Sequence, residues 1–338
     1  MHIKGINNKK LSVIEPKTFF SVSLRENLYA LQNSIPLILE LYPYAKYYLI
    51  CRAADIEFFA INLHQNKNVK FINEDSLISF NRFTNYYKKI ITHSQFQNKT
   101  DSRLSWYYQQ SIKIIFMLKL EKNKKNFPMV MFDADSIPLK KIIFFNDINI
   151  SILYGSLSEK HLDYFKSLDF IFDSFDYPLL GFTTQFFSST LNEVRNIELI
   201  IKKKYHNIHD KNVEELVTCM ILESTLKAHG SIEGSKFSEQ ELVGVSNSLN
   251  SSQSKQTPII SFRSWVLDGM LSSCQIRILR LLSVSLVTYE NRITFESRQI
   301  GWLKFLLAVS ADLKPQIIQL IKIKFKIIFS LFYKNRKS

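Results

Sequence analysis

The sequence predicts an α/β protein with a mostly parallel, doubly wound sheet and flanking helices. Two observations lead to this class. Short apolar and β-branched segments alternate along the chain with segments whose apolar residues recur at helical spacing. In addition, the 338 residues are 46% hydrophobic and include 27 Phe, which is ample material for a core. We therefore expect one large α/β domain followed by a C-terminal appendage.

The first part of the chain carries the alternation of strand and helix. β-branched and aromatic residues predict strands over residues 17–24, 46–51 and 68–72. Apolar residues at helical spacing predict helices between them, over residues 25–43 and 54–63. In a parallel sheet of this kind, ligands bind beyond the carboxyl ends of the strands.

Residues 104–120 are expected to form a helix with two distinct faces. Trp106, Gln110 and Lys113 recur at spacings of four and three, so they share one face. The apolar residues of the other face are Leu104, Tyr108, Ile112 and Ile115.

Further along the chain, the apolar run MVMFD at residues 129–133 predicts another strand. Residues 161–172 and 213–230 read as helices, and the second of them ends in a glycine. The stretch at residues 246–256 contains five serines and one charged residue, which is typical of a loop or linker.

Cysteine content and hydropathy bound the class of protein. The three cysteines, Cys51, Cys219 and Cys274, are widely spaced and odd in number, so we expect neither a disulfide framework nor a zinc cluster. The N-terminus has no long apolar stretch typical of a signal peptide, and no run of about eighteen apolar residues predicts a transmembrane helix. These features favour a cytosolic protein in a reducing compartment.

The net charge of +14 predicts acidic partners, such as nucleotide phosphates, anionic lipid or nucleic acid. Seven Lys or Arg and no acidic residue lie between Lys314 and Ser338, interspersed with Ile, Leu and Phe. A basic amphipathic segment of this kind binds anionic membrane surfaces. We expect residues 271–338 to form a helical membrane-associating segment. A C-terminal helix packed on the core, or a strand in the alternating run at residues 321–326, remain alternatives.

The segment FPMVMFDADSIPL, residues 127–139, ends an apolar strand with Asp133 and Asp135. Burying a carboxylate is costly unless it is paired or binds a metal ion, and two neighbouring carboxylates also repel each other. The pattern offers oxygen ligands to Mg²⁺ or Mn²⁺, and such a cation stabilises the charge of a departing diphosphate. Nucleotide-sugar transferases use this arrangement.

Two other interpretations of Asp133 and Asp135 stay open. Phosphatases of the haloacid-dehalogenase type begin with the same string, and their first Asp is the nucleophile. Ile137 stands where those enzymes usually have Thr or Val, and the motif lies more than 130 residues into the chain. In the other interpretation, Asp133 caps a helix and Asp135 lies in a solvated turn.

Three elements together resemble a family of bacterial glycosyltransferases associated with capsule and lipopolysaccharide assembly. Residues 106–113 match its W-x-x-Q-Q-x-x-K helix, and residues 129–135 match its D-A-D strand end. FSEQELVG at residues 237–244 is similar to its S-E-Y-E-x-Y-G element. Order and spacing agree over roughly residues 15–265. The resemblance implies a GT-A-like transferase domain, over residues 15–270, and a nucleotide-sugar donor.

The resemblance also implies roles for the two aspartates. Asp133 and Asp135 are expected to bind Mn²⁺ or Mg²⁺, directly or through water, and Asp133 also to contact the substrate. Gln240 and Val243 depart from the family pattern, which tends to have Tyr at both positions.

Four residues of the helix at 104–120 are expected to contact the substrate. Lys113 would offset the charge of the diphosphate, and Gln109 or Gln110 would donate hydrogen bonds to sugar hydroxyls. Trp106 fits a stacking or a core position equally well. The alternative for the polar residues is an exposed helix face.

Glu239 and Glu241 are the next carboxylates of interest. An inverting transferase needs a general base that accepts the proton of the acceptor hydroxyl, and we expect Glu239 to fill that role. Glu241 is expected to contact the substrate, since alternate spacing would point only one of the two inward. The histidines, among them His161 and His229, lie in no recognisable ligand motif and are assigned no role.

The expected function is metal-dependent transfer of a sugar from a UDP-linked or other nucleotide-sugar donor. The expected acceptor is a hydroxyl of a bacterial surface polysaccharide or of its lipid-linked precursor. The protein would act at the cytoplasmic face of the inner membrane, against an anionic surface and without nucleic acid as a partner. The alternatives are a sugar phosphatase of the type named above and a catalytically inactive scaffold that binds glycan or membrane.

Overall fold

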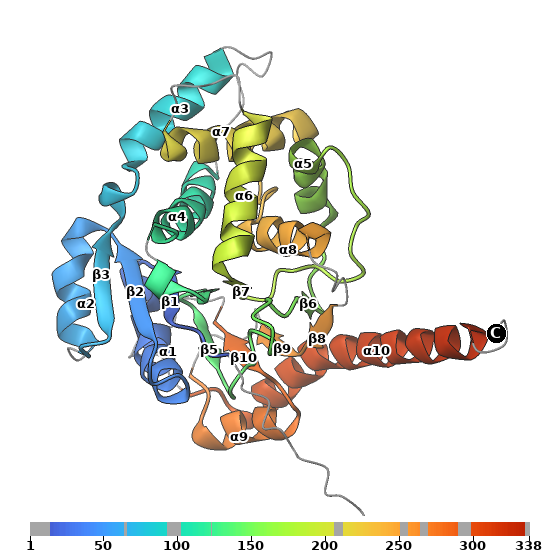
Figure 1. Cartoon of the computed structure of the whole chain (residues 1–338). Coiled ribbons are helices and arrows are strands. Elements are labelled where there is room, and N and C mark those ends of the chain that lie inside the picture. Colours follow the sequence, from blue (N-terminus) through green and yellow to red (C-terminus); the bar gives the residue numbers. More distant parts are fainter. Residues whose placement is uncertain are drawn as a thin grey trace, which may run out of the picture.

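The computed structural model has an α/β fold. It describes residues 14–63, 66–92, 103–122, 124–205, 212–250, 256–263, 270–289 and 299–334. The central sheet of these residues has five strands in the order β3–β2–β1–β4–β7 (Figure 1). Their bounds are Thr18–Val22 for β1, Lys46–Cys51 for β2, Val69–Asn73 for β3, Met129–Phe132 for β4 and Phe186–Ser189 for β7. The first four coincide with the predicted strands to within a few residues.

Most strand pairings in this sheet are parallel. β1 lies between β2 and β4, with Phe20 opposite Tyr48 on one side and Met131 on the other. β2 and β3 are also parallel, whereas β7 runs antiparallel to β4. The predicted mostly parallel sheet is therefore confirmed.

Helices cover both faces of the sheet (Figure 1). Phe19 faces the core beneath α1 (Leu28–Leu41) and α2 (Ile56–Asn62), while its neighbour Phe20 enters the core on the opposite face. Successive side chains of a strand point to opposite faces, so a sheet covered on both sides needs both to be apolar. The helices of the second face are α3 (Phe80–Thr92), α4 (Leu104–Leu120), α5 (Leu162–Phe172), α6 (Leu191–Lys204), α7 (Val213–His229) and α8 (Glu239–Asn250).

α4 has the predicted bounds, but both of its faces are buried. It contacts β1 on one side and α7 on another. Gln110 and Lys113 are therefore only 1% and 8% exposed, although they lie away from the predicted apolar face. The alternative of an exposed polar face is wrong for these two residues.

The loop predicted over residues 246–256 is wrong in its first part. α8 continues to Asn250, and Ser246 and Asn247 are buried in it. Gly244 allows α8 to pack closely against Phe182. A Cβ atom at this position would lie only 2.1 Å from the ring of Phe182. Residues 251–255 lie outside the described part of the chain.

A second, three-stranded sheet has the order β5–β10–β9. β5 (Ser136–Pro138) follows the aspartate pair directly, and β10 (Leu286–Thr288) pairs with it antiparallel. β9 (Ser261–Arg263) lies on the other side of β10. A pair of short strands, β6 (Tyr154–Ser156) and β8 (Thr257–Ile259), lies nearby. The predicted division of the chain at residue 270 stays a prediction, although β10 joins strands from before that position.

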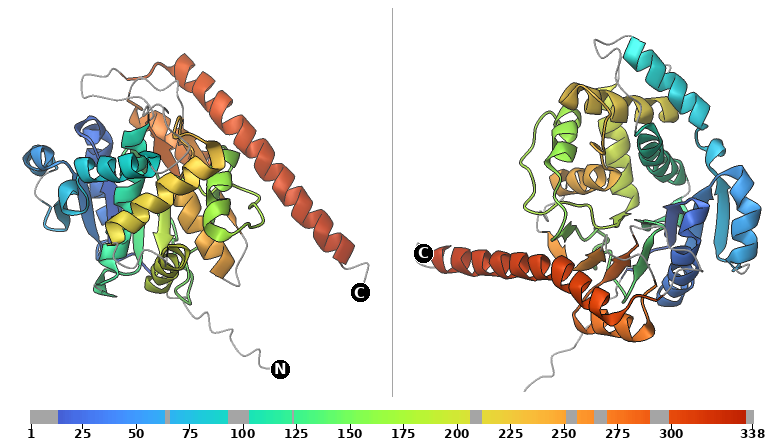
Figure 2. Two further views of the ribbon diagram at one scale, coloured as in Figure 1. Left: turned by 90° about the horizontal axis from the view of Figure 1, so that it is seen from above. Right: turned by 180° about the vertical axis from the view of Figure 1, so that it is seen from behind.

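The C-terminal segment contains α9 (Ser273–Leu281) and α10 (Trp302–Lys334). α10 is a helix through residues 321–326, so the alternative of a strand there is wrong. Much of its length projects from the rest of the described chain (Figure 2). Its exposed apolar side chains are Trp302, Leu303, Leu306, Leu307, Ile317, Ile318, Ile321 and Phe325. Among the described helices, none combines the length and the apolar character needed to cross a bilayer.

Candidate active site

A cavity of about 630 Å³ opens at the carboxyl ends of β1 and β4. Val22 at the end of β1 and Asp133 just after β4 both line it. This is the edge of the sheet where an α/β fold binds ligands, and the volume lies in the usual range of small-molecule sites. The three segments that carry the family resemblance meet here. They contribute Trp106, Gln109, Lys113, Asp133, Asp135, Ser238, Glu239 and Gln240.

The backbone around the aspartate pair is fixed from two directions. The N–H of Asp133 donates to the carbonyl of Gln185 at 2.9 Å. The N–H of Tyr289, just after β10, donates to the carbonyl of Asp135 at 3.0 Å. Ser136 Oγ and Thr288 Oγ1 lie 2.8 Å apart between the same two segments. β10 therefore holds the segment that carries both carboxylates.

Lys113 connects Asp133 with Glu239. Its Nζ donates to Asp133 Oδ1 and to Glu239 Oε1, each at 2.7 Å. Burial alone would lower the pKa of Lys113, but the charges of the two carboxylates outweigh it and raise the pKa above its ordinary value. Burial raises the pKa of Glu239, against the opposing charge of Lys113. An internal ammonium group thus compensates Asp133 and Glu239, while the role of Lys113 toward a diphosphate stays a prediction.

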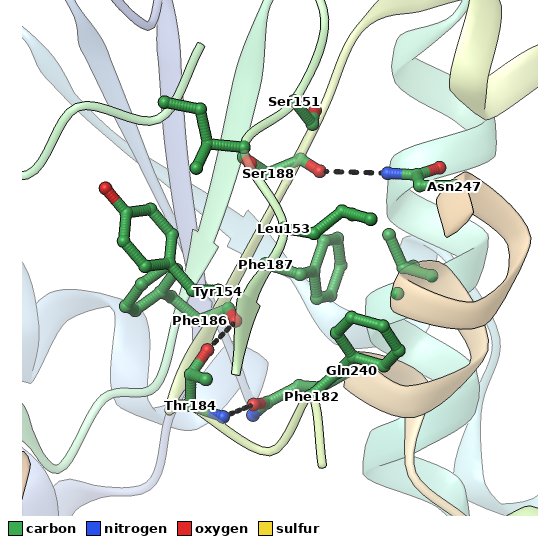
Figure 3. A pocket seen from close by; sticks show the side chains of 13 residues that line it. Ser151, Leu153, Tyr154, Phe182, Thr184, Phe186, Phe187, Ser188, Gln240 and Asn247 are labelled. Atoms are coloured by element: carbon green, nitrogen blue, oxygen red, sulfur yellow. Dashed lines mark hydrogen bonds between the residues drawn. The ribbon is translucent and has the colours of Figure 1, made fainter. Parts of the chain in front are cut away.

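Gln240 holds the second oxygen of Asp133. Its Nε2 donates to Asp133 Oδ2 at 2.8 Å, and its Oε1 accepts from the backbone N–H groups of Thr184 at 2.9 Å and Gln185 at 3.0 Å. Figure 3 shows this amide pointing from α8 toward Thr184, beside a small space of about 20 Å³. Gln240 is one of the departures from the family pattern, and the structure gives it a positioning role for Asp133.

Asp135 has the chemistry of a cation ligand. Its side chain is partly exposed and lines the cavity. Burial raises its pKa to about 6, and the charge of Asp133 adds to this, whereas Arg263 and Lys113 oppose it. A carboxylate in this position gains from a bound cation. Within the described residues, no group of three or more His, Cys, Asp and Glu side chains stands ready to hold a metal ion. A cation here would complete its coordination with substrate oxygens and water, as Mg²⁺ commonly does.

Two predicted substrate contacts lie behind the cavity wall. Gln110 Oε1 accepts a hydrogen bond from the backbone N–H of Glu239 at 3.2 Å, and Gln110 does not line the cavity. Glu241 is fully buried, and its Oε1 accepts from the N–H of Phe182 and the hydroxyl of Thr183 at 2.9 and 3.0 Å. The structure brings both beside the site, where they support its wall, and their predicted contacts with substrate stay untested.

The remaining predicted residues of α4 and α8 lie at the cavity. Trp106 and Gln109 line it, and the indole N–H of Trp106 donates to the carbonyl of Phe237 at 3.3 Å. Ser238 caps the start of α8, because its hydroxyl accepts the N–H of Glu241 at 3.3 Å. Glu239 lines the cavity while being only 2% exposed.

Sequence reasoning missed a group of polar residues on another wall of the cavity. Arg263 forms an ion pair with Glu159, and His161 Nε2 lies 3.5 Å from Glu159 Oε2. The hydrogen bond with Glu159 raises the pKa of His161 above its ordinary value. Tyr164 also lines the cavity, and its ring centroid lies 4.9 Å from that of His161. The available signal was weak, since only the position of Arg263 at the end of a short apolar run hinted at a strand-end residue.

No protein-family model and no curated protein matches the sequence. Solved structures similar to the chain include PaToxG glycosyltransferase, at 12% identity and a TM-score of 0.30, covering 63% of this chain and 69% of that one. They also include the galactosyltransferase LgtC in complex with donor and acceptor sugar analogs, at 10% identity and a TM-score of 0.42, covering 87% and 95%. An active-site mutant of LgtC has the same identity and coverage with a TM-score of 0.44.

Proposed function

We propose that this protein is a glycosyltransferase that moves a sugar from a nucleotide-sugar donor to an acceptor hydroxyl. One observation supports this most: Lys113, Asp133, Asp135 and Glu239 converge from three separate segments in one cavity at the carboxyl ends of the strands. Such a cavity offers a cation site, a positioned ammonium group and a carboxylate base. These are the groups that transfer from a diphosphate leaving group requires.

The proposed metal is Mn²⁺ or Mg²⁺, held chiefly by Asp135. Asp133 accepts hydrogen bonds on both oxygens, from Lys113 and from Gln240, so its carboxylate is oriented before any ligand arrives. Oδ1 retains a lone pair with which Asp133 would contact the cation, directly or through water. The bound cation would supply charge stabilisation for the departing diphosphate.

Glu239 is the proposed general base. Burial raises its pKa, which increases its tendency to accept a proton from a hydroxyl group. The hydrogen bond from Lys113 and the one between the Glu239 N–H and Gln110 fix the position of this residue. Glu239 would take the proton of the acceptor hydroxyl as that oxygen attacks the sugar.

We further propose that the acceptor is a bacterial surface glycan or its lipid-linked precursor, and that α10 holds the protein at the cytoplasmic face of an anionic membrane. Exposed apolar residues of α10, such as Leu303, Leu307 and Phe325, support this proposal. The Lys and Arg residues after Lys314, with no acidic residue among them, add attraction to anionic headgroups.

The test of the donor class is the thermal stability of the purified chain with UDP, GDP, CDP and dTDP, each with and without Mn²⁺. A ligand that binds only the folded state at a hundred times its Kd stabilises it by about 2.7 kcal/mol. We expect one nucleotide to raise the midpoint in the presence of Mn²⁺, and D135N to abolish the shift. D163N is the matched control, because the side chain of Asp163 is 49% exposed, pairs with Lys166 at 3.1 Å and lies outside the cavity.

The outcomes separate the three functional classes. A metal-dependent shift in wild type and D163N but not in D135N supports the transferase. No shift with any nucleotide, together with a phosphorylated Asp133 after incubation with a sugar phosphate, would instead establish the phosphatase. If cells that carry D135N in place of the wild-type protein show no loss of its biological function, the protein is a scaffold.

A further inference from the structure

Arg263 carries a guanidinium group into the wall of the cavity, at the end of β9. Its side chain is 21% exposed, and its Nη1 pairs with Glu159. When the amide of Gln185 is oriented to satisfy both of its ends, its oxygen accepts from Arg263 Nη1 at 3.0 Å and its nitrogen donates to Asp133 Oδ2 at 3.3 Å. Gln185 thus bridges Arg263 to the aspartate pair.

An anionic ligand in this cavity needs cationic partners. Four carboxylates of the described residues line the cavity: Asp133, Asp135, Glu159 and Glu239. Lys113 already donates to two of them. A diphosphate adds further negative charge, so it needs cations beyond Lys113 and the proposed metal, and Arg103 and Arg263 are the other described Lys or Arg residues that line the cavity. A guanidinium group has five N–H donors in one plane, which allows it to keep a carboxylate partner and bind phosphate oxygens at the same time.

We propose that Arg263 binds the phosphate oxygens of the donor's diphosphate, in the orientation set by Glu159 and Gln185. This inference rests on the proposed function and adds a named phosphate-binding residue on β9 to it. Lysine at this position would keep the charge but lose the planar arrangement of donors.

The backbone of β9 is held by α10, which sets the position of Arg263. The N–H of Arg263 donates to Asp312 Oδ2 at 2.8 Å. Gln316 Oε1 accepts a hydrogen bond from the backbone N–H of Ser261 at 3.2 Å. Gln316 Nε2 donates a hydrogen bond to the backbone carbonyl of Ser261 at 2.6 Å. Asp312 is therefore a positioning residue that acts through the backbone of Arg263.

The experiment measures by calorimetry, in the presence of Mn²⁺, the affinity of the full chain for a nucleoside, its monophosphate and its diphosphate. The nucleoside carries the base of the nucleotide that raises the thermal midpoint in the test above. We expect R263Q to weaken the diphosphate about 10- to 100-fold, as for the loss of a hydrogen bond to a charged group, and to leave the nucleoside unchanged. R263K should recover part of the loss. D312A should weaken the diphosphate to a smaller extent, again without effect on the nucleoside.

R195Q is the matched control, because Arg195 pairs with Glu121 at 2.8 Å and lies outside the cavity. Wild-type diphosphate affinity in R263Q would overturn the role of Arg263 and leave the proposed function intact. Failure of the wild-type chain to bind any nucleoside diphosphate would remove both. If R263Q does not fold, R263K and D312A decide the question: unchanged diphosphate affinity in both would overturn the inference.

Discussion

Lys113 is the residue on which the internal charge balance of the site depends. Its ammonium group lies 2.7 Å from oxygens of Asp133 and Glu239, and its side chain is 9% exposed. Removing one partner of a buried ion pair leaves uncompensated charge, which commonly costs about 3–5 kcal/mol. We expect K113M to lose stability on this scale, measured by urea denaturation.

K119M on the same helix is the control for K113M. Lys119 pairs with Glu214 at 2.7 Å but is 32% exposed, so its loss should cost no more than about 1 kcal/mol. The double variant K113M/E239Q should regain part of the loss, because it removes one of the two stranded carboxylates. Equal losses in K113M and K119M would show that Lys113 does not compensate buried charge.

Glu241 makes the stability of the fold depend on pH. Burial raises its pKa from 4.5 to about 7, so the folded state keeps a proton that the unfolded state releases near pH 4.5. The stabilisation that this retained proton gives the folded state is fully present below pH 4.5 and is lost as the pH rises through 7. By linkage, the loss is on the order of 3 kcal/mol.

The variant E241Q imitates the protonated form of this residue. Its amide oxygen can accept the hydrogen bonds that Phe182 and Thr183 donate to Glu241. Denaturation at pH 5 and pH 8 should therefore show E241Q more stable than wild type at pH 8, with the difference shrinking toward pH 5. A difference that does not change with pH would assign the titration to another group.

At the level of single residues, the sequence predicted which segments form the site but not which side chains pair with one another. Asp133, Asp135 and Glu239 line one cavity, and their roles there stay predictions. The pairing of Lys113 with two of the carboxylates follows from a tertiary arrangement that spans 126 positions of sequence separation. Arg263 and Glu159 were missed for the same reason, since local patterns carry no information about such a distant partner.

At the level of elements, α10 presents an apolar stripe that the described residues leave uncovered. We expect L303S/L307S to weaken sedimentation with anionic vesicles without lowering the thermal midpoint, because the two leucines are 74% and 61% exposed. L199S is the matched control on α6, where Leu199 is 63% exposed. Vesicle binding that falls equally in L303S/L307S and in L199S would argue against a docking role for this stripe. Vesicle binding that neither variant weakens would argue against it as well.

The long helices and the first four strands of the central sheet were predicted well, whereas the three-residue strands were not. α4 and α7 agree with the predicted ranges to within one residue, because a dozen or more positions report their periodicity. β5, β9 and β10 have three residues each, too few for any period, and they form only because they pair with one another. The burial of α4 on all sides was missed because it depends on α7, a helix more than 90 residues later.

At the level of the whole molecule, the C-terminal part is expected to contribute to the core. β10 lies between β5 and β9, and residues after 270 supply much of a third apolar core that includes Leu279, Val287 and Phe305. We expect a fragment that ends at residue 270 to lose cooperative thermal unfolding and metal-dependent nucleotide binding, both measured against the full chain.

A fragment that ends at residue 317 is the control, because it keeps β10, Asp312 and Gln316. It should retain the thermal midpoint and nucleotide binding but lose affinity for anionic vesicles with the basic end of α10. A stable fragment ending at 270 that still binds nucleotide would support the predicted boundary at that residue.

The pairing of β5 with β10 also has a consequence for the order of events during synthesis. A ribosome completes Asp135 about 150 residues before it completes Tyr289, whose backbone N–H holds the Asp135 carbonyl. The sheet strands β1 to β4 are available early, but the strand that anchors the aspartate segment emerges late. We therefore expect a nascent chain that has already formed β1 to β4 to lack an ordered Asp133–Asp135 segment. The proposed binding of a nucleotide-sugar donor is accordingly expected only of chains whose synthesis has passed β10.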